Sequence, residues 1–242
     1  MLFNRIFNRG SKGGLPYNLP LTTCYLCKKF VLELINPHVQ SYAEQYSSPE
    51  HDLLKEINAF TQKHPESQML SGHLQGKVLE MLSCMIRPRR ILEVGTFTGY
   101  SALCLAKGLT EDGQLHTIEI REEEAVKAKE FFSRSVYHSK IILHLGSALD
   151  IIPALNETWD LVFIDADKPA YIEYFNLVLP KLRKNGFIFA DNIFFHGQVL
   201  EGEVKGKNAK AIKEFNEYIQ KRTDIEKVIL TLRDGLFLIR KL

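Results

Sequence analysis

The sequence predicts an α/β fold, a doubly wound sheet of seven mostly parallel strands that ends in an antiparallel C-terminal hairpin strand. From Arg90 onward, short apolar runs alternate with amphipathic segments, which is typical of β-α-β units. The last two β-rich runs, 226–232 and 235–241, are separated only by Arg233 and Asp234. Such a link is too short for a parallel crossover, so these two runs must form an antiparallel hairpin.

The composition is that of a globular chain. Hydrophobic residues make up 45% and charged residues 25% of the 242 residues, which excludes wholesale disorder, collagen-like repeats and a coiled coil. No run approaches the roughly 20 apolar residues of a membrane span. Lys and Arg number 31 against 29 Asp and Glu, so bulk charge gives no reason to expect a nucleic-acid partner.

The four cysteines are too few and too scattered for a disulfide framework, which favours a reducing, cytoplasmic location. Cys24 and Cys27 have C-x-x-C spacing, but a zinc site needs a second pair of ligands and none follows at a matching distance. We therefore do not expect a metal at this pair.

The N-terminal residues differ in composition from the rest of the chain. Basic residues occur there with no acidic residue before Glu33, and the run 10–14 is rich in Gly and Ser like a flexible linker. We predict a basic, flexible extension over residues 1–29. One domain is predicted over 30–242, and its part 30–89 is expected to be helical.

Two helices are expected before the first strand. Ser47 and Glu50 have the spacing of a capping box, and apolar residues follow at helical intervals. A second helix is expected from about Gly72, and Pro88 would stop it. The apolar stripes of these helices exceed what a sheet edge needs, which favours a symmetric homodimer.

The remaining elements follow in order from the same periodicities. The parallel strands are expected at 90–94, 115–120, 140–145, 160–164 and 186–190. The helices that follow them are expected near 100–109, 122–136, 148–154, 170–184 and 209–222.

The first strand runs into a glycine-containing turn at 95–99, where ligands bind in doubly wound sheets. A dinucleotide fingerprint would need glycines at Phe97 and Tyr100, and no P-loop follows. The turn therefore suits a cofactor with an adenosine but no phosphate. Glu93 precedes the turn, and Glu119, at the end of the second strand, is placed to accept both ribose hydroxyls. Alternatively, the glycines only close the turn and Glu119 is a solvated strand end.

Acidic residues follow the fourth and fifth strands. Asp165 and Asp167 come after the fourth strand, and Asp191 and Asn192 come at the end of the fifth. Because neighbouring parallel strands end at the same edge, we expect Asp165, Asp191 and Asn192 to converge. Two carboxylates and an amide would select a hard cation such as Mg²⁺, Mn²⁺ or Ca²⁺. Alternatively, these residues are a helix cap and a turn.

Lys168 lies three residues beyond Asp165. A cation bound nearby would lower the pKa of Lys168 and make the amine available as a base. Alternatively, Lys168 is a solvated lysine at the start of a helix.

Taken together, these segments resemble the cation-dependent class I O-methyltransferases that use S-adenosylmethionine, typified by the caffeoyl-coenzyme A and catechol methyltransferases. The resemblance extends from about residue 33 to 242 and implies their Rossmann-like fold. The segments that carry it are 93–101, 163–168, 191–192 and 234–235.

The resemblance also implies roles for individual residues. Asp165, Asp191 and Asn192 would hold the divalent cation, and Lys168 would act with Asp165 in catalysis. The residues implied to line the methyl donor are Leu70, Ser71, Glu93, Gly95, Thr96, Ser101, Glu119, Ala148 and Asp167. Where plant members carry a tryptophan after the Asp-Asn pair, this chain has Phe194-Phe195, which bears on acceptor specificity rather than on the chemistry.

The implied activity is methyl transfer from S-adenosylmethionine to a hydroxyl of a small catechol-like acceptor, a vicinal diol. One alternative is an RNA O-methyltransferase acting on tRNA, which the near-neutral charge disfavours. Another is a non-catalytic S-adenosylmethionine-binding protein, which the intact cation-ligand set and Lys168 disfavour. A dehydrogenase would require the nicotinamide fingerprint that the turn lacks.

Overall fold

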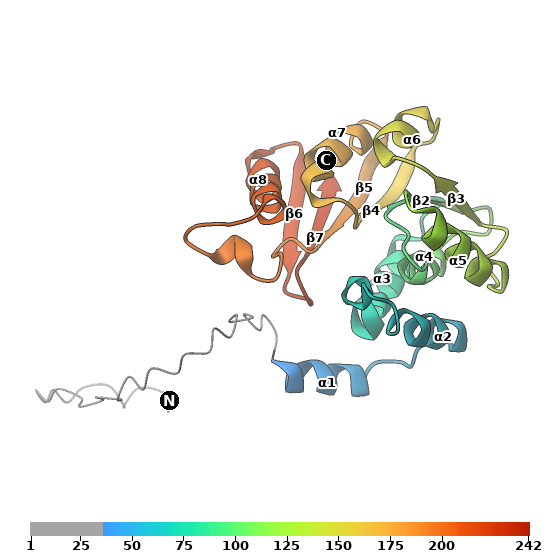
Figure 1. Cartoon of the computed structure of the whole chain (residues 1–242). Coiled ribbons are helices and arrows are strands. Elements are labelled where there is room, and N and C mark those ends of the chain that lie inside the picture. The colour runs from blue at the N-terminus through green and yellow to red at the C-terminus, as the bar shows by residue number, and fades with distance from the viewer. Residues whose placement is uncertain (1–35) are drawn as a thin grey trace, which may run out of the picture. The chain divides into compact units, whose positions relative to one another are not determined.

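The computed structural model describes residues 36–242, so the expectations for residues 1–29, Cys24 and Cys27 included, lie outside the described part of the chain. Within residues 36–242, seven strands form one sheet in the order β3-β2-β1-β4-β5-β7-β6, with helices on both faces (Figure 1). β1 to β5 pair in parallel, and β7 lies antiparallel between β5 and β6. The predicted fold class is therefore confirmed.

The elements have the following bounds. The strands are β1 (Arg90–Val94), β2 (Gln114–Glu119), β3 (Ile141–Leu145), β4 (Trp159–Ile164), β5 (Leu182–Asp191), β6 (Ile225–Leu230) and β7 (Leu236–Lys241). The α-helices are α1 (Pro37–Gln45), α2 (Asp52–Thr61), α3 (Gly72–Ile86), α4 (Tyr100–Ala106), α5 (Glu122–Ser133), α6 (Ala148–Ala154), α7 (Tyr171–Val178) and α8 (Lys207–Lys221). Three short 3₁₀ turns within these residues are η1 (Ser67–Met69), η2 (Lys168–Ala170) and η3 (Gln198–Leu200).

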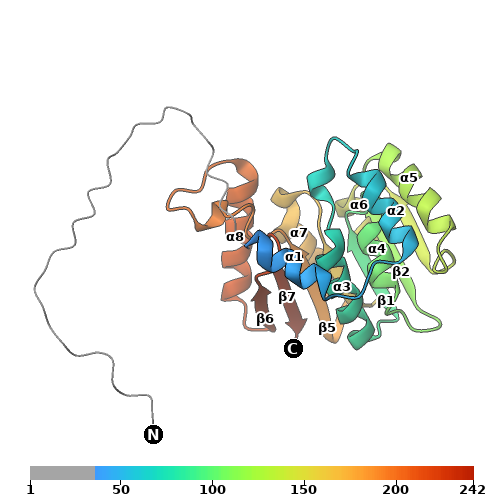
Figure 2. The same ribbon diagram turned by 90° about the horizontal axis from the view of Figure 1, so that it is seen from below.

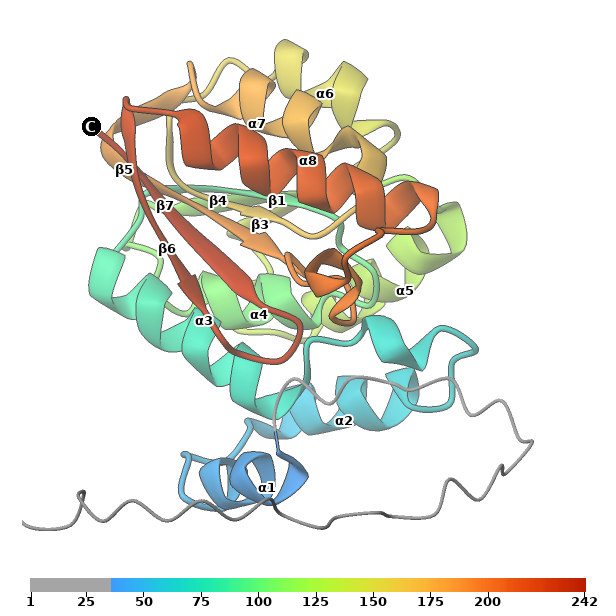
Figure 3. The same cartoon turned by 90° about the vertical axis from the view of Figure 1, so that its left-hand side faces the viewer.

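The sheet separates two hydrophobic cores, as alternation along β4 shows. Val162 and Ile164 belong to the core under α6, α7 and α8, whereas Leu161 and Phe163 belong to the core under α2 to α5. Figure 3 shows α6, α7 and α8 on one face of the sheet and α3 and α4 on the other. Seen from the latter side, α2 and α3 lie in front of the strands (Figure 2). Burial on both faces explains why the parallel strands are almost continuously apolar.

The expected capping box is wrong. α2 begins with His51 as its N-cap residue, and Ser47 donates instead to the carbonyl of Ala43 at the end of α1 (2.7 Å). The carboxylate of Glu50 accepts a hydrogen bond from the hydroxyl of Tyr100 in α4. Glu50 is therefore bound to a residue of another helix and does not cap α2 as the local pattern had predicted. Three α-helices, not two, precede β1 within the described residues, because α1 was not expected.

The expected helix over 170–184 is too long. α7 ends at Val178, and β5 begins at Leu182 rather than at residue 186. Pro180 lies between the two elements, and proline cannot continue a helix because it lacks the amide hydrogen. The pairing of β4 with β5 is irregular between Trp159 and Leu161, which admits the extra residues at the start of β5.

The strand order places the carboxyl ends of β1, β2, β4 and β5 at one edge. From β1 the chain continues to β2 and β3 on one side, whereas β4 and β5 lie on the other. The β1/β4 boundary is the switch point at which open α/β sheets bind ligands. No helix within residues 36–242 is long and apolar enough to cross a bilayer.

Candidate active site

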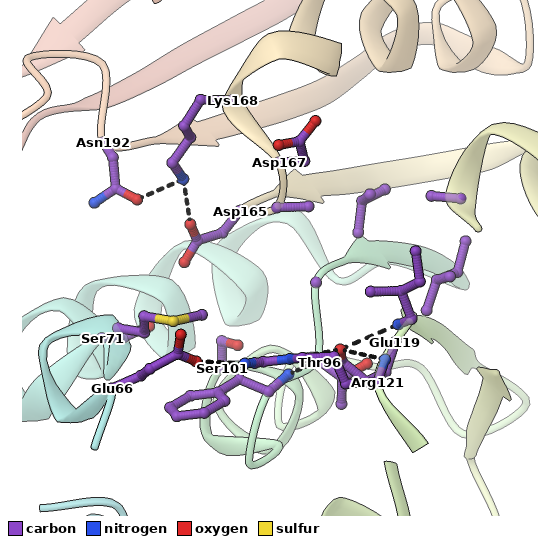
Figure 4. A pocket seen from close by; sticks show the side chains of 18 of the residues that line it. Glu66, Ser71, Thr96, Ser101, Glu119, Arg121, Asp165, Asp167, Lys168 and Asn192 are labelled. Atoms are coloured by element: carbon purple, nitrogen blue, oxygen red, sulfur yellow. Dashed lines mark hydrogen bonds and ion pairs between the residues drawn. The ribbon is translucent and has the colours of Figure 1, made fainter. Parts of the chain in front are cut away.

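A cavity of about 780 Å³ opens at the switch point of the sheet. Its walls come from the carboxyl ends of β1, β2 and β4, from the segment before α3 and from the β6–β7 hairpin (Figure 4). The predicted site residues that line it are Leu70, Ser71, Gly95, Thr96, Ser101, Glu119, Ala148, Asp165, Asp167, Lys168 and Asn192. Glu93 and Asp191, the other two predicted site residues, are almost completely buried behind this wall.

The turn after β1 needs glycine at its first position. Gly95 has φ +101°, and a Cβ there would lie 2.0 Å from the carbonyl oxygen of Asp165. The amide of Asp165 in turn donates to the carbonyl of Val94 (2.9 Å). Gly95 therefore lets the ends of β1 and β4 come into direct contact, which brings the two halves of the predicted site together.

Glu93 organises hydroxyl groups behind the cavity. Its carboxylate accepts hydrogen bonds from Ser101 Oγ (2.6 Å) and Thr117 Oγ1 (2.5 Å), and the Thr117 hydroxyl also contacts Thr96 Oγ1 (2.5 Å). Burial raises the pKa of Glu93 to about 8, although both hydrogen bonds oppose this rise. The structure thus places Glu93 beneath Ser101 and Thr96, which themselves face the cavity.

Glu119 is buried and not a solvated strand end, so that alternative is wrong. One carboxylate oxygen accepts from the amide of Phe97 (2.7 Å), and the other accepts from the amides of Ile120 (3.1 Å) and Arg121 (3.0 Å). These bonds fix the carboxylate at the cavity wall (Figure 4). Oε1 also accepts from Arg121 Nε (3.5 Å), so the acceptor position that remains for a ligand hydroxyl is on Oε2.

A segment before α3 is tied to this end of the cavity by charged groups. Glu66 forms an ion pair with Arg121, whose guanidinium lies 5.3 Å from the centroid of the Phe97 ring. His64 Nε2 lies 3.2 Å from Glu124 Oε1 on α5. The same segment supplies Leu70 and Ser71 to the wall, as the resemblance implied.

Asp165, Lys168 and Asn192 meet on the other side of the cavity (Figure 4). Lys168 Nζ donates to Asp165 Oδ1 (2.8 Å), Asn192 Oδ1 (2.7 Å) and the hydroxyl of Tyr171 (2.8 Å). Burial works to lower the pKa of Lys168, but the charge of Asp165 and the contact with Tyr171 outweigh it, so the pKa is raised. These contacts have the opposite effect to the lowering expected from a nearby cation.

Asp191 lies behind Asn192 with both carboxylate oxygens engaged. Oδ2 accepts from Gln75 Nε2 (2.6 Å), and Oδ1 accepts from the backbone N–H of Asn192 (2.8 Å). Burial raises the pKa of Asp191, and the charge of Asp165 raises it further. The two carboxylates therefore destabilise each other, and the positive charges of Arg233 and Lys168 offset part of this effect.

The oxygen set fits a hard cation in its chemistry. Among the described residues no cluster of three His, Cys, Asp or Glu side chains is placed to bind a metal. Beside the carboxylates of Asp165 and Asp191, the third ligand would have to be the side-chain amide oxygen of Asn192. The ammonium of Lys168 already lies between oxygens of Asp165 and Asn192. These oxygens thus attract a positive charge, but the divalent cation itself stays a prediction.

Comparison with known proteins identifies the family. The family model described as O-methyltransferase matches residues 44–242. This chain belongs to the O-methyltransferase family. The expectation that the chain is an enzyme of the O-methyltransferase class is thereby confirmed.

Three relatives of this O-methyltransferase illustrate the match. This chain is 35% identical to the catechol O-methyltransferase of Niastella koreensis over 162 residues. The aligned region covers 65% of this chain and 73% of the relative. The O-methyltransferase TomG of Streptomyces achromogenes, solved with S-adenosylmethionine, is 30% identical with a TM-score of 0.76 over 84% of this chain and 96% of that one. A methyltransferase of Podospora anserina, solved with S-adenosylhomocysteine, is 27% identical with a TM-score of 0.78 over 85% and 94%.

Several residues of the site were not predicted from the sequence of this O-methyltransferase. Arg121 and Tyr171 could have been found from their positions in the sequence. Arg121 lies two residues after Glu119, and Tyr171 lies three residues after Lys168. No sequence pattern indicates the partners of Gln75 and Arg233, because their contacts join distant parts of the chain.

Proposed function

We propose that this O-methyltransferase transfers the methyl group of S-adenosylmethionine to one hydroxyl of a small aromatic vicinal diol, with a divalent cation at the acceptor side. The observation that carries the proposal is that one cavity is lined both by the Gly95 turn with Glu119 and by Asp165, Lys168 and Asn192. A donor end and an acceptor end would therefore share one cavity.

The donor end suits S-adenosylmethionine. The carboxylate of Glu119, held by three backbone amides, lies at the cavity wall and would accept from a ribose hydroxyl. Ser101 and Thr96 present hydroxyls whose positions depend on Glu93. The relatives from Streptomyces achromogenes and Podospora anserina, solved with S-adenosylmethionine and S-adenosylhomocysteine, support this assignment. The remaining residues assigned to this end are Leu70, Ser71, Gly95, Ala148 and Asp167.

The acceptor end suits a diol because its cation ligands are hard oxygens. Asp165, Asp191 and Asn192 would hold Mg²⁺, Mn²⁺ or Ca²⁺. A bound divalent cation supplies the charge that lowers the pKa of a phenolic hydroxyl from its ordinary value near 10 and orients the diol. The relative from Niastella koreensis, a catechol O-methyltransferase, supports a diol acceptor.

The transfer itself needs a proton acceptor and close approach. In the proposed mechanism Lys168 accepts or shares the proton of the reacting hydroxyl. The acceptor oxygen then forms a bond to the methyl carbon as the bond from that carbon to sulfur breaks, and the positive sulfur becomes neutral. Holding the acceptor oxygen about 3 Å from the methyl carbon would make the step effectively unimolecular.

The test is transfer of labelled methyl from S-adenosylmethionine to caffeic acid, with Mg²⁺ or with EDTA. We compare the native enzyme with Asp191→Asn and with the control Asp112→Asn, an exposed acid paired with Arg89. The proposal expects Mg²⁺-dependent labelling by the native enzyme and the control, and its loss in Asp191→Asn. Labelling that is insensitive to EDTA and to Asp191→Asn, or labelling of tRNA but not of any diol, would contradict it.

A further inference from the structure

Gln75 contacts two charged groups from distant parts of the chain. It lies on α3 and is almost completely buried. Its Nε2 donates to Asp191 Oδ2 (2.6 Å), and its Oε1 accepts from Arg233 Nη1 (3.2 Å). A carboxylate on one side and a guanidinium on the other allow only one orientation of the amide, since nitrogen must face the acid and oxygen the base. Gln75 is thus a directed link between these two charges.

Arg233 lies in the short turn between β6 and β7 and has a strained backbone. Its φ is +47°, in the left-handed region where glycine is favoured. Its side chain lines the cavity, and Nη1 also donates to the carbonyl of Ser71 (2.7 Å). Strain of this kind is concentrated at functional sites, and a glycine here would relieve the backbone but lose both contacts. We read the strain as a sign that the guanidinium has a role in the site.

A continuous chain of hydrogen bonds therefore runs from the cavity wall to the buried Asp191. It runs from Ser71, on the donor side of the cavity, through Arg233 and Gln75 to Asp191, on the acceptor side. Each contact is direct, and the two residues Ser71 and Arg233 also line the cavity. Outer-shell groups of this kind orient the ligands of metal sites and affect metal affinity strongly.

We propose that Gln75 and Arg233 are positioning residues that orient the Asp191 carboxylate for the divalent cation and tie that orientation to Ser71 at the donor side. This inference rests on the proposed function, because it requires a cation at Asp191. Two consequences follow. Loss of either side chain weakens cation binding, and loss of Arg233 also removes the energetic coupling between the two ends of the cavity, which is reciprocal by linkage.

The test measures binding of Mn²⁺ to the purified full chain by electron paramagnetic resonance of unbound Mn²⁺, with and without saturating S-adenosylhomocysteine. The variants are Gln75→Met, which keeps the length of the side chain but removes the amide, and Arg233→Gly, which removes the guanidinium and relieves the backbone. The matched control is Arg87→Gly. Arg87 is exposed and has φ +51° at the end of α3, so the same exchange is made at a similar positive φ away from the site.

The inference predicts that Gln75→Met binds Mn²⁺ about 10- to 100-fold more weakly, the range found for outer-shell partners. Arg233→Gly should also bind Mn²⁺ more weakly, while its thermal midpoint shifts no more than that of Arg87→Gly. S-adenosylhomocysteine should tighten Mn²⁺ binding to the native enzyme and to Arg87→Gly, but not to Arg233→Gly. A purely structural role would change the thermal midpoint without changing the Mn²⁺ affinity of the folded protein.

The outcomes that overturn the inference are distinct. If the native enzyme binds Mn²⁺ and both variants bind it equally well per folded molecule, the positioning role is wrong and the cation site stands. If the native enzyme binds no Mn²⁺ under any of these conditions, the cation dependence in the proposed function fails and the positioning role fails with it.

Discussion

Lys168 Nζ lies 2.8 Å from Asp165 Oδ1, so an ammonium group is bound to one of the oxygens that we assign to the divalent cation. The same nitrogen lies 2.7 Å from Asn192 Oδ1. Lys168 and the cation would therefore compete for two ligand atoms. The charge of Asp165 and the contact with Tyr171 outweigh burial and raise the pKa of Lys168, whereas the proposed reaction needs an amine that can take a proton.

Removing Lys168 should separate cation binding from catalysis. Lys168→Met is expected to bind Mn²⁺ at least as tightly as the native enzyme, because the competing ammonium is gone. Its kcat is expected to fall by about 100-fold or more, the range for loss of a general base. Mn²⁺ titration and initial rates check this, with Lys168→Arg as the variant that keeps the charge but cannot act as a base. A kcat that is unchanged in both variants would remove Lys168 from the mechanism.

The ion pair between Glu66 and Arg121 should contribute to donor binding. The two side chains are 45% and 37% exposed, so the pair is worth at most about 1 kcal/mol, and Glu66→Gln should raise the dissociation constant of S-adenosylhomocysteine about two- to fivefold. Calorimetric titration at low salt measures the effect. The matched control is Glu56→Gln, which breaks the comparable pair between Glu56 and Arg134 away from the cavity. Equal effects of both substitutions would show that the Glu66 pair has no specific role.

Glu93 should make stability depend on pH. Its pKa is about 8 in the folded protein, against about 4.3 in an unfolded chain, so between these values the folded state holds a proton that the unfolded state has lost. Stability therefore falls as pH rises through this window, by at most about 1.4 kcal/mol per pH unit, and levels off above about pH 8. Glu93→Gln should show a smaller fall. Urea unfolding of both proteins from pH 5 to 9 checks this, and parallel curves would contradict it.

Gly95→Ala should be much more damaging than Gly72→Ala. Both glycines have positive φ, +101° and +75°, but only at Gly95 does a Cβ meet a backbone atom, the carbonyl oxygen of Asp165. Gly72→Ala should cost about 1–2 kcal/mol from the left-handed backbone alone. Gly95→Ala should cost clearly more and should also weaken binding of S-adenosylhomocysteine. Urea unfolding measures both costs, and equal values would show that the Asp165 contact adds nothing.

Local patterns predicted much of the fold. β1 has the same bounds as the expected strand, and the C-terminal hairpin was expected, although five residues (231–235) rather than two separate its strands. These features depend on residues that are neighbours in sequence. The capping box failed because Tyr100 binds Glu50 across 50 residues, and the helix over 170–184 was too long because Pro180 follows α7 and cannot continue a helix.

The candidate site was predictable where strand ends carry it. Asp165, Lys168 and Asn192 meet because β4 and β5 are neighbours in the sheet. This was expected because parallel strands that follow each other in the sequence usually pair. Gln75 and Arg233 were not predictable, because their partners lie 116 and 158 residues away. Their positions depend on how α3 and the β6–β7 turn pack against the sheet, and no local periodicity specifies that packing.

The central claim is that a chelated diol, and not a single hydroxyl, is the methyl acceptor. The most direct measurement compares methyl transfer from labelled S-adenosylmethionine to catechol and to phenol, each with Mg²⁺ and with EDTA. Phenol has the same ring and reacting group but lacks the second oxygen for chelation. We predict that catechol is methylated only with Mg²⁺ and that phenol is not methylated in either condition. Methylation of phenol at a rate comparable to that of catechol, or methylation of catechol in EDTA, would contradict the account.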